Sequence, residues 1–306
     1  FWEEVPVNGR SCITLLAVGS LLLPCVGCGS RHDGTTPEMT ESQAKTIRVE
    51  GSDTMVNLAQ AWAETYHGKR PDVSVQVLGG GSGVGIASLI NGTCDMADAS
   101  RKMKDKELQS AIEQQGVEPV EHIVGYDALA VYVHKDNPID SISLEELAEI
   151  YGDGGNITNW SQIEGGADLE ITRVSRQNSS GTYAYFREAV LGKERDYKLG
   201  SIDQSGSKDV VALVSKTPGA IGYSGMGYAT PEVKMLKISE KKGDPGVAPT
   251  VENAVSGDYP ITRPLHIYTL GEPDGVVAEY LEWIGSAEGQ AVVSELGYVP
   301  VINKDE

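Results

Sequence analysis

Hydrophobic residues from position 46 onward follow two spacings, one typical of strands and one typical of helices. Residues 46–50 (TIRVE) and 73–78 (VSVQVL) alternate between apolar and polar side chains, which predicts two strands. Between them, residues 55–66 carry apolar side chains at intervals of three and four, which predicts an amphipathic helix with one buried stripe. We therefore expect the folded part of the chain to begin as strand, helix, strand.

The same alternation continues toward the C-terminus. We expect further strands at 95–99, 171–175, 220–223 and 265–270, and two more within 117–133 on either side of Gly125. We expect further helices at 86–90, 144–151 with Ser143 as N-cap, 182–191, 208–215, 276–284 and 289–296. Strands that alternate with helices through short turns predict an α/β fold, with a mostly parallel sheet covered by helices.

Three turns share a composition of small hydroxyl residues and glycine. They are 51–54 (GSDT), 79–83 (GGGSG) and 179–182 (SSGT), and each follows a predicted strand and precedes a predicted helix. A helix start leaves backbone N–H groups unpaired and carries partial positive charge, and glycine lets the backbone approach a ligand closely. In open α/β sheets such turns gather at the carboxyl ends of the strands. The three turns together predict a site for a small oxyanion.

A simpler interpretation exists for each turn taken alone. Ser and Thr before a helix are usually N-caps, and a glycine-rich run can be nothing more than a turn. Two arginines favour the oxyanion site, because Arg101 follows the strand predicted at 95–99 and Arg176 follows the one at 171–175. An arginine at such a place more often forms a surface ion pair, but guanidinium is also the group that grips an oxyanion with paired hydrogen bonds.

The formal net charge of −19 argues against nucleic acid as a partner and against an anionic membrane surface. Affinity for both depends mainly on Lys and Arg that neutralise phosphate groups. A buried oxyanion site stays compatible with the charge, because hydrogen bonds inside a closed cleft are screened little.

Signatures of enzymes and metal sites are missing from the sequence. The five histidines have neither metal-ligand spacing nor a recognisable nucleophile as partner, and no second cysteine pair supports a zinc site. The run 79–86 contains a dinucleotide-like glycine string without the acidic residue that such a site needs, and neither a P-loop nor a GxSxG elbow is present. We expect a binding protein with no cofactor and no metal.

The N-terminus is typical of an export signal. Residues 13–26 form an apolar run that is too short to span a bilayer but fits the core of a signal peptide. Residues 26–30 (VGCGS) resemble a bacterial lipobox, which implies a signal peptide at 1–28 and lipidation of Cys28. Cys25 stands where a lipobox usually has leucine, so simple secretory cleavage is the alternative. Residues 29–45 are polar and predict a flexible tether.

Five segments in this order resemble the phosphate-binding proteins of bacterial phosphate ABC importers. They are GSDTM (51–55), GGGSGVGI (79–86), ADASRKMKD (97–105), SRQNSSGTYAYF (175–186) and PGAIGY (218–223). The resemblance extends over roughly residues 46 to 300. It implies a type II periplasmic-binding-protein fold, in which two α/β lobes are joined by a hinge of crossover strands. Lobe 1 would hold 46–133 and 260–306, and lobe 2 would hold 134–259.

The resemblance also implies a set of phosphate ligands drawn from both lobes. They are Ser52, Asp53, Thr54, Ser82, Ser100, Arg101, Arg176, Ser180, Gly181 and Thr182. Several members of the family have an aspartate where this chain has Arg101, and that carboxylate accepts the proton of HPO4²⁻ and so rejects sulfate. In this chain the acceptor must lie elsewhere, and Asp53, followed by Asp98, is the candidate.

The function implied by the resemblance is capture of inorganic phosphate and its delivery to the membrane permease of an ABC importer. We expect a monomer that is periplasmic or on the cell surface, with the membrane reached only through the lipid anchor. The alternatives are a binding protein for sulfate or molybdate and, from another class, a secreted phosphohydrolase.

Overall fold

The structure, a computed structural model, describes residues 45–301. Its strands are β1 (Lys45–Gly51), β2 (Val73–Leu78), β3 (Met96–Ala99), β4 (Pro119–His134), β5 (Ser141–Ser143), β6 (Thr172–Arg176), β7 (Ile202–Gln204), β8 (Ala220–Gly225), β9 (Val233–Met235), β10 (Lys237–Ser239) and β11 (Thr262–Leu270). Its α-helices are α1 (Val56–Lys69), α2 (Ser82–Ile90), α3 (Asp105–Gln115), α4 (Leu144–Tyr151), α5 (Gly181–Phe186), α6 (Ser207–Val214), α7 (Val251–Ser256), α8 (Gly275–Gly285) and α9 (Ala287–Glu295). Short turns of other helix types lie at η1 (Trp160–Gln162), η2 (Arg187–Leu191) and η3 (Met226–Tyr228). The signal peptide, Cys28 and nearly all of the tether lie outside the described residues.

Most strands form one mixed sheet in the order β2-β1-β3-β11-β4-β8-β6-β7, with β9 paired to β4. The pairs β1–β2, β1–β3, β6–β7 and β6–β8 are parallel, whereas β11 is antiparallel to both β3 and β4. The α/β class predicted from the sequence, with mixed sheets, is confirmed.

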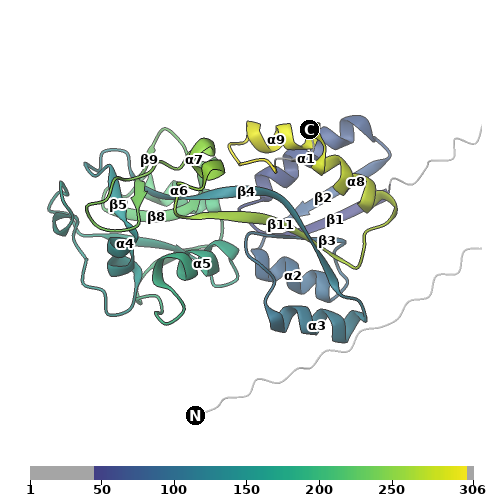
Figure 1. Ribbon diagram of the computed structural model, residues 1–306, viewed down its shortest axis with the longest axis horizontal. Coiled ribbons are helices and arrows are strands. Elements are labelled where there is room, and N and C mark those ends of the chain that lie inside the picture. The colour runs from purple at the N-terminus through teal and green to yellow at the C-terminus, as the bar shows by residue number, and fades with distance from the viewer. Residues whose placement is uncertain (1–44, 302–306) are drawn as a thin grey trace, which may run out of the picture. The chain divides into compact units, whose positions relative to one another are not determined.

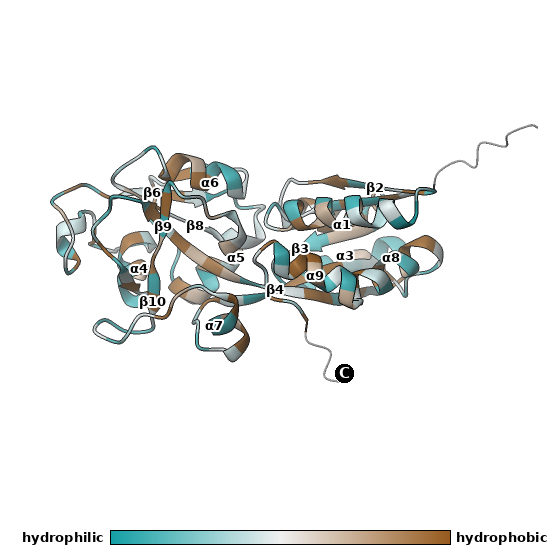
Figure 2. Cartoon of the chain, turned by 90° about the horizontal axis from the view of Figure 1, so that it is seen from above, coloured by the Kyte–Doolittle hydropathy of each residue, from teal (hydrophilic) through white to brown (hydrophobic). Residues whose placement is uncertain are grey.

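The core is divided between the two ends of this sheet. One hydrophobic cluster centres on the second half of β4 with β8, α4 and α6, and two others surround β1 and β3. Figure 1 shows the corresponding groups of elements on either side, with β4 and β11 running from one group into the other. Hydrophobic residues continue along β4 from one group to the other (Figure 2). Among residues 45–301, no helix combines the length and the apolar character needed to cross a bilayer.

Strand β4 corrects one prediction. The two strands expected around Gly125 are a single strand, and its pairing with β11 shifts register at Leu265 and His266. A Cβ on Gly125 would lie 3.2 Å from the carbonyl oxygen of Val299, so glycine permits this close approach. The irregularity that the glycine signals is therefore a bulge within the ladder and not a strand end.

The glycine-rich turn also differs from the prediction. Helix α2 begins at Ser82, four residues earlier than expected, so that Ser82 lies inside the helix. Gly80 and Gly81 have φ values of +126° and +96°, a region that side chains with a Cβ rarely adopt. Gly85 lies flat on β1, because a Cβ there would be 2.1 Å from the carbonyl oxygen of Glu50. These glycines bring the start of α2 against the end of β1.

Candidate functional site

Two of the predicted turns meet Ser100 at the carboxyl ends of β1 and β3. Ser52 follows β1, Ser100 follows β3, and the Oγ of Ser52 donates to the Oγ of Ser100 over 2.9 Å. The Oγ of Ser82 accepts from the backbone N–H of Ser100 over 3.0 Å. All three hydroxyls are at most 2% exposed. Parallel strands end at the same edge of a sheet, which is why residues so far apart in sequence gather here.

The turn before α5 approaches this group from the other end of the sheet. The hydroxyls of Thr54 and Thr182 are hydrogen-bonded over 2.8 Å. A Cβ on Gly181 would lie 2.3 Å from the Oγ of Ser82 and 2.5 Å from the Oγ of Ser100, so only glycine allows this approach. Ser180 is an N-cap, since its Oγ accepts from the backbone N–H groups of Thr182 and Tyr183. The simple capping interpretation is thus correct for Ser180 itself.

The two predicted arginines lie in different environments. Arg176 is 1% exposed and donates to the carboxylate of Asp53 (3.1 Å), the carbonyl of Ser205 (2.8 Å) and the hydroxyl of Ser207 (3.1 Å). Burial lowers the pKa of the Arg176 guanidinium, and the Asp53 carboxylate opposes that shift. Because Asp53 follows β1 and Arg176 ends β6, this pair connects the two ends of the sheet.

Arg101 instead pairs with Glu107 within its own part of the chain. Its Nη1 and Nη2 donate to the two carboxylate oxygens of Glu107 at 2.8 and 2.7 Å, a bidentate geometry. The Arg101 guanidinium and the backbone N–H of Lys104 hold the pKa of Glu107 below its usual value, against the effect of burial. The structure therefore places Arg101 beside the hydroxyl cluster formed by Ser52, Ser82 and Ser100, with its donors directed at a carboxylate.

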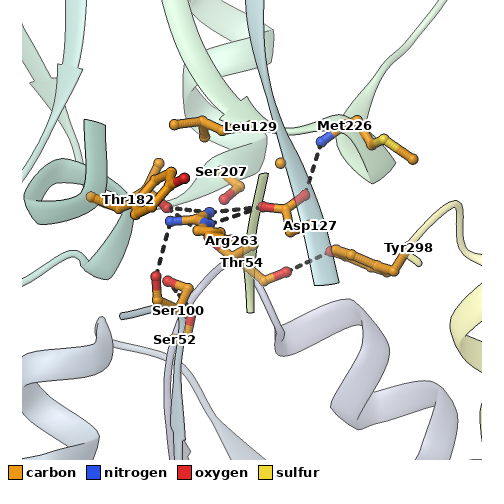
Figure 3. Close-up of polar contacts among 12 residues, drawn as sticks. Ser52, Thr54, Ser100, Asp127, Leu129, Thr182, Ser207, Met226, Arg263 and Tyr298 are labelled. Carbon is orange, nitrogen blue, oxygen red and sulfur yellow. Dashed lines mark hydrogen bonds and ion pairs between the residues drawn. The ribbon is translucent and has the colours of Figure 1, made fainter. Parts of the chain in front are cut away.

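Sequence reasoning missed a further buried pair at the centre of the site, Arg263 and Asp127 (Figure 3). They face each other on β11 and β4 and are 1% and 0% exposed at their side chains. Nη2 of Arg263 donates to the carboxylate of Asp127 (2.8 Å) and to the hydroxyls of Thr54 (3.1 Å) and Thr182 (3.0 Å). Burial raises the pKa of Asp127, and Arg263 opposes that rise.

A signal for this pair was present in the sequence. Asp127 stands at the start of the apolar run ALAVYV, and Arg263 lies between Thr262 and Pro264, just before the strand predicted at 265–270. A charge inside a strand that is otherwise buried needs a partner of opposite sign. The sequence thus signals that Asp127 needs a partner, but Arg263 lies outside the strand predicted at 265–270, so the pairing itself is set by the register of β11 with β4.

The two candidates for the proton acceptor are also separated. Asp53 lies at the edge of the cluster, where its Oδ1 accepts from the backbone N–H of Gly80 over 2.9 Å and its Oδ2 accepts from Arg176. The side chain of Asp98 shares a face of the sheet with Met96 and Ile267, within the apolar cluster beneath α1 and α8. Its Oδ1 has no hydrogen-bond partner, and burial raises its pKa to about 8.

Among residues 45–301, no group of three or more His, Cys, Asp or Glu side chains could hold a metal ion. The remaining arrangement consists of buried hydroxyls, backbone N–H groups and guanidinium donors from both ends of one sheet. Such donors can hydrogen-bond an oxyanion, and the positive charge of two guanidinium groups attracts it.

Comparison with known proteins agrees with this arrangement. A family model for the PBP superfamily domain matches residues 36–288, which defines the class as a periplasmic binding protein. The phosphate-binding protein PstS of Pseudomonas aeruginosa is 34% identical over 305 residues, and the match covers 94% of each chain. PstS of Bacillus subtilis is 31% identical over 297 residues, covering 94% of this chain and 93% of the relative. The chain belongs to the PstS family of phosphate-binding proteins, and the resemblance noted in the sequence is confirmed.

Solved structures give the same result. A phosphate ABC transporter substrate-binding protein from Clostridium perfringens, solved with bound phosphate, superimposes with a TM-score of 0.76 at 30% identity and covers 84% of this chain and 100% of its own. An ABC-type phosphate transport receptor from Vibrio cholerae superimposes with a TM-score of 0.66 at 28% identity, covering 83% and 100%.

Proposed function

We propose that this chain is an extracytoplasmic solute-binding protein that holds one inorganic phosphate and delivers it to an ABC importer. The observation that carries the proposal is the convergence of buried hydroxyls from both ends of the sheet on the buried guanidinium of Arg263. The second buried guanidinium, Arg176, reaches the same site through Asp53. The names of the relatives and the phosphate bound in the C. perfringens structure support phosphate as the ligand. The work of such a site is binding and release, with no reaction.

The proposed ligand set extends the one expected from the sequence by one residue, Arg263. It consists of Ser52, Asp53, Thr54, Ser82, Ser100, Arg101, Arg176, Ser180, Gly181, Thr182 and Arg263. Charge-assisted hydrogen bonds contribute about 1.5 to 3 kcal/mol each. Micromolar affinity needs about −8 kcal/mol, so a few such bonds suffice even after the anion has lost its hydration.

Calorimetry with phosphate, sulfate and arsenate tests the proposal. We expect phosphate and arsenate to bind at least tenfold more tightly than sulfate, which has no proton to donate at neutral pH. We further propose Asp53 as the acceptor of that proton, because it lies at the hydroxyl cluster whereas the Asp98 side chain faces the apolar core. Asp53→Asn should then reduce the preference for phosphate over sulfate. Tighter binding of sulfate or molybdate than of phosphate by the unaltered protein would overturn the proposed function.

The location is part of the proposal. The relatives are binding components of phosphate transport, which supports a periplasmic or cell-surface site of action and a permease as partner. Lipidation at Cys28 would tether the protein to the membrane there. Detergent partitioning of the full chain and of Cys28→Ala tests the anchor, since only the unaltered chain should enter the detergent phase. Equal partitioning of the two would leave simple cleavage as the explanation.

A further inference from the structure

A cavity of about 710 Å³ runs from solvent to the hydroxyl cluster. Its deep end is lined by Ser100 and Arg263, which are 0% and 1% exposed. Its outer walls are the segment 101–104 on one side and the residues of α5, η2 and Lys193 on the other. The outer lysines Lys102, Lys104 and Lys193 are exposed. The cavity thus connects the proposed ligands with bulk water.

The charges that line this cavity are mostly positive. Arg101, Lys102, Lys104, Arg187, Lys193 and Arg263 line it, and Glu188 is the one carboxylate among its lining residues. Three of the cations are paired elsewhere, Arg101 with Glu107, Arg187 with Asp196 and Arg263 with Asp127. The three exposed lysines are therefore opposed within the lining by Glu188 alone.

The charge of the cavity lining is positive, whereas the net charge of the molecule is negative. At a net charge of −19, the protein as a whole repels a phosphate anion at long range. Salt screens that repulsion over about 8 to 10 Å, so an anion that reaches the cavity mouth responds mainly to the nearby lysines. A hollow with low-dielectric walls also concentrates the field of charges of one sign.

A second cavity beside the site is not lined by an excess of positive charge. It measures about 220 Å³ and is lined by Asp53, Asp209 and Lys208 among other residues. Its two carboxylates and one ammonium group give no positive balance that would draw in an anion.

We propose that the larger cavity is the access route of the anion and that Lys102, Lys104 and Lys193 steer phosphate through it. This inference rests on the proposed function, because it takes phosphate as the ligand. In this proposal the three lysines raise the rate at which phosphate associates, and they do not contact the bound anion.

Stopped-flow fluorescence tests the steering by measuring the association and dissociation rate constants of phosphate across a range of ionic strength. In the unaltered protein the association rate constant should fall as salt rises, since the local lysine field dominates. Without steering, the acidic molecule should give the opposite slope, because salt would screen repulsion.

A pair of double variants isolates the position of the charge. Lys102→Glu with Lys193→Glu should slow association by about 5- to 10-fold at low salt and leave the dissociation rate constant unchanged. Lys216→Glu with Lys241→Glu changes the net charge equally at exposed positions away from the cavity lining, and should slow association less than twofold.

The possible results separate the two proposals. Phosphate binding with equal association rates in the two double variants, or a rate in the unaltered protein that rises with salt, would overturn the steering alone. A total lack of phosphate binding in calorimetry would overturn the proposed function and the steering with it.

Discussion

Arg263 is the residue through which the separate parts of the site are joined. One guanidinium group contacts Thr54 on the first turn, Thr182 at the start of α5 and Asp127 on the neighbouring strand. Its donors are fixed in a planar fork, and a lysine at this place would supply a single point charge. The geometry therefore depends on the guanidinium itself as well as on its charge.

Replacing Arg263 by lysine should weaken phosphate binding at least tenfold, equivalent to about 1.4 kcal/mol, because several of these hydrogen bonds are lost. Arg48→Lys, on the exposed side of β1, is the matched control and should leave the affinity unchanged. The double variant Arg263→Met with Asp127→Asn avoids an unpaired buried charge. The double variant should be more stable than Arg263→Met alone, but its affinity for phosphate should stay as low as that of the single variant. Recovery of affinity in the double variant would assign Arg263 a purely structural role.

Asp98 predicts an unusual dependence of stability on pH. Its pKa is raised to about 8 in the folded protein, against 3.8 ordinarily, because the carboxyl is buried and Oδ1 lacks a partner. Between these values the folded state binds the proton and the unfolded state releases it. This contribution to stability is therefore complete below about pH 4 and is lost as pH rises through about 8.

Asp98→Asn removes that dependence. The variant should match the unaltered protein near pH 4 and exceed its free energy of unfolding by several kcal/mol, up to about 5 kcal/mol, near pH 8.5, measured by urea denaturation. A constant difference across this range would contradict a protonated Asp98.

At the scale of elements, the turn between β2 and α2 carries a close backbone contact between the two ends of the sheet. Gly81 has φ +96°, and a Cβ there would lie 2.8 Å from the carbonyl oxygen of Ser179. The backbone N–H of Gly83 donates to the same carbonyl over 3.0 Å. The turn thus touches the segment before α5 through backbone atoms.

Gly81→Ala should weaken phosphate binding about tenfold or more, because the methyl group holds the two segments apart, and should cost about 1 to 3 kcal/mol of stability from backbone strain. Gly154→Ala provides the control, since Gly154 also has positive φ (+72°) but no atom within 4 Å of the added Cβ. It should lose stability without losing affinity. Equal affinities of the two variants in calorimetry would show that the contact is irrelevant to binding.

Elements were predictable where local periodicity was strong, and the site was predictable where turns carry an unusual composition. Helix α1 and strand β2 match the expected segments closely, because α1 buries a regular stripe and Val73, Val75 and Val77 of β2 all face one hydrophobic cluster. Helix α3 was missed, since among its residues only Ala111 is buried and the apolar stripe is weak. Arg263 and the Arg101–Glu107 pair could not be placed from local pattern, because their partners are set by strand register and by helix packing.

At the scale of the whole molecule, the contacts between the two ends of the sheet describe a closed form. Thr54 with Thr182 and Asp53 with Arg176 both span the site. Because donors come from both sides, an anion bound among them should favour this arrangement over a more open one.

Small-angle scattering with and without phosphate tests the closure. The profile with phosphate should match the structure described here, and the profile without phosphate should have a larger radius of gyration. The Gly81→Ala variant should keep the larger radius of gyration at phosphate concentrations that close the unaltered protein. Identical profiles for the unaltered protein under both conditions would contradict ligand-driven closure.

The pairing of β4 with β11 has a consequence for how the polypeptide can be rearranged. Ala128 and Thr262 are register partners, so the chain leaves on one strand and returns on its immediate neighbour. Residues 129–261 are thus an insertion between two neighbouring strands, and its two ends lie side by side. Bridging Ala128 to Thr262 with a short hairpin loop would delete residues 129–261 while leaving residues 45–128 and 262–301 in their native adjacency.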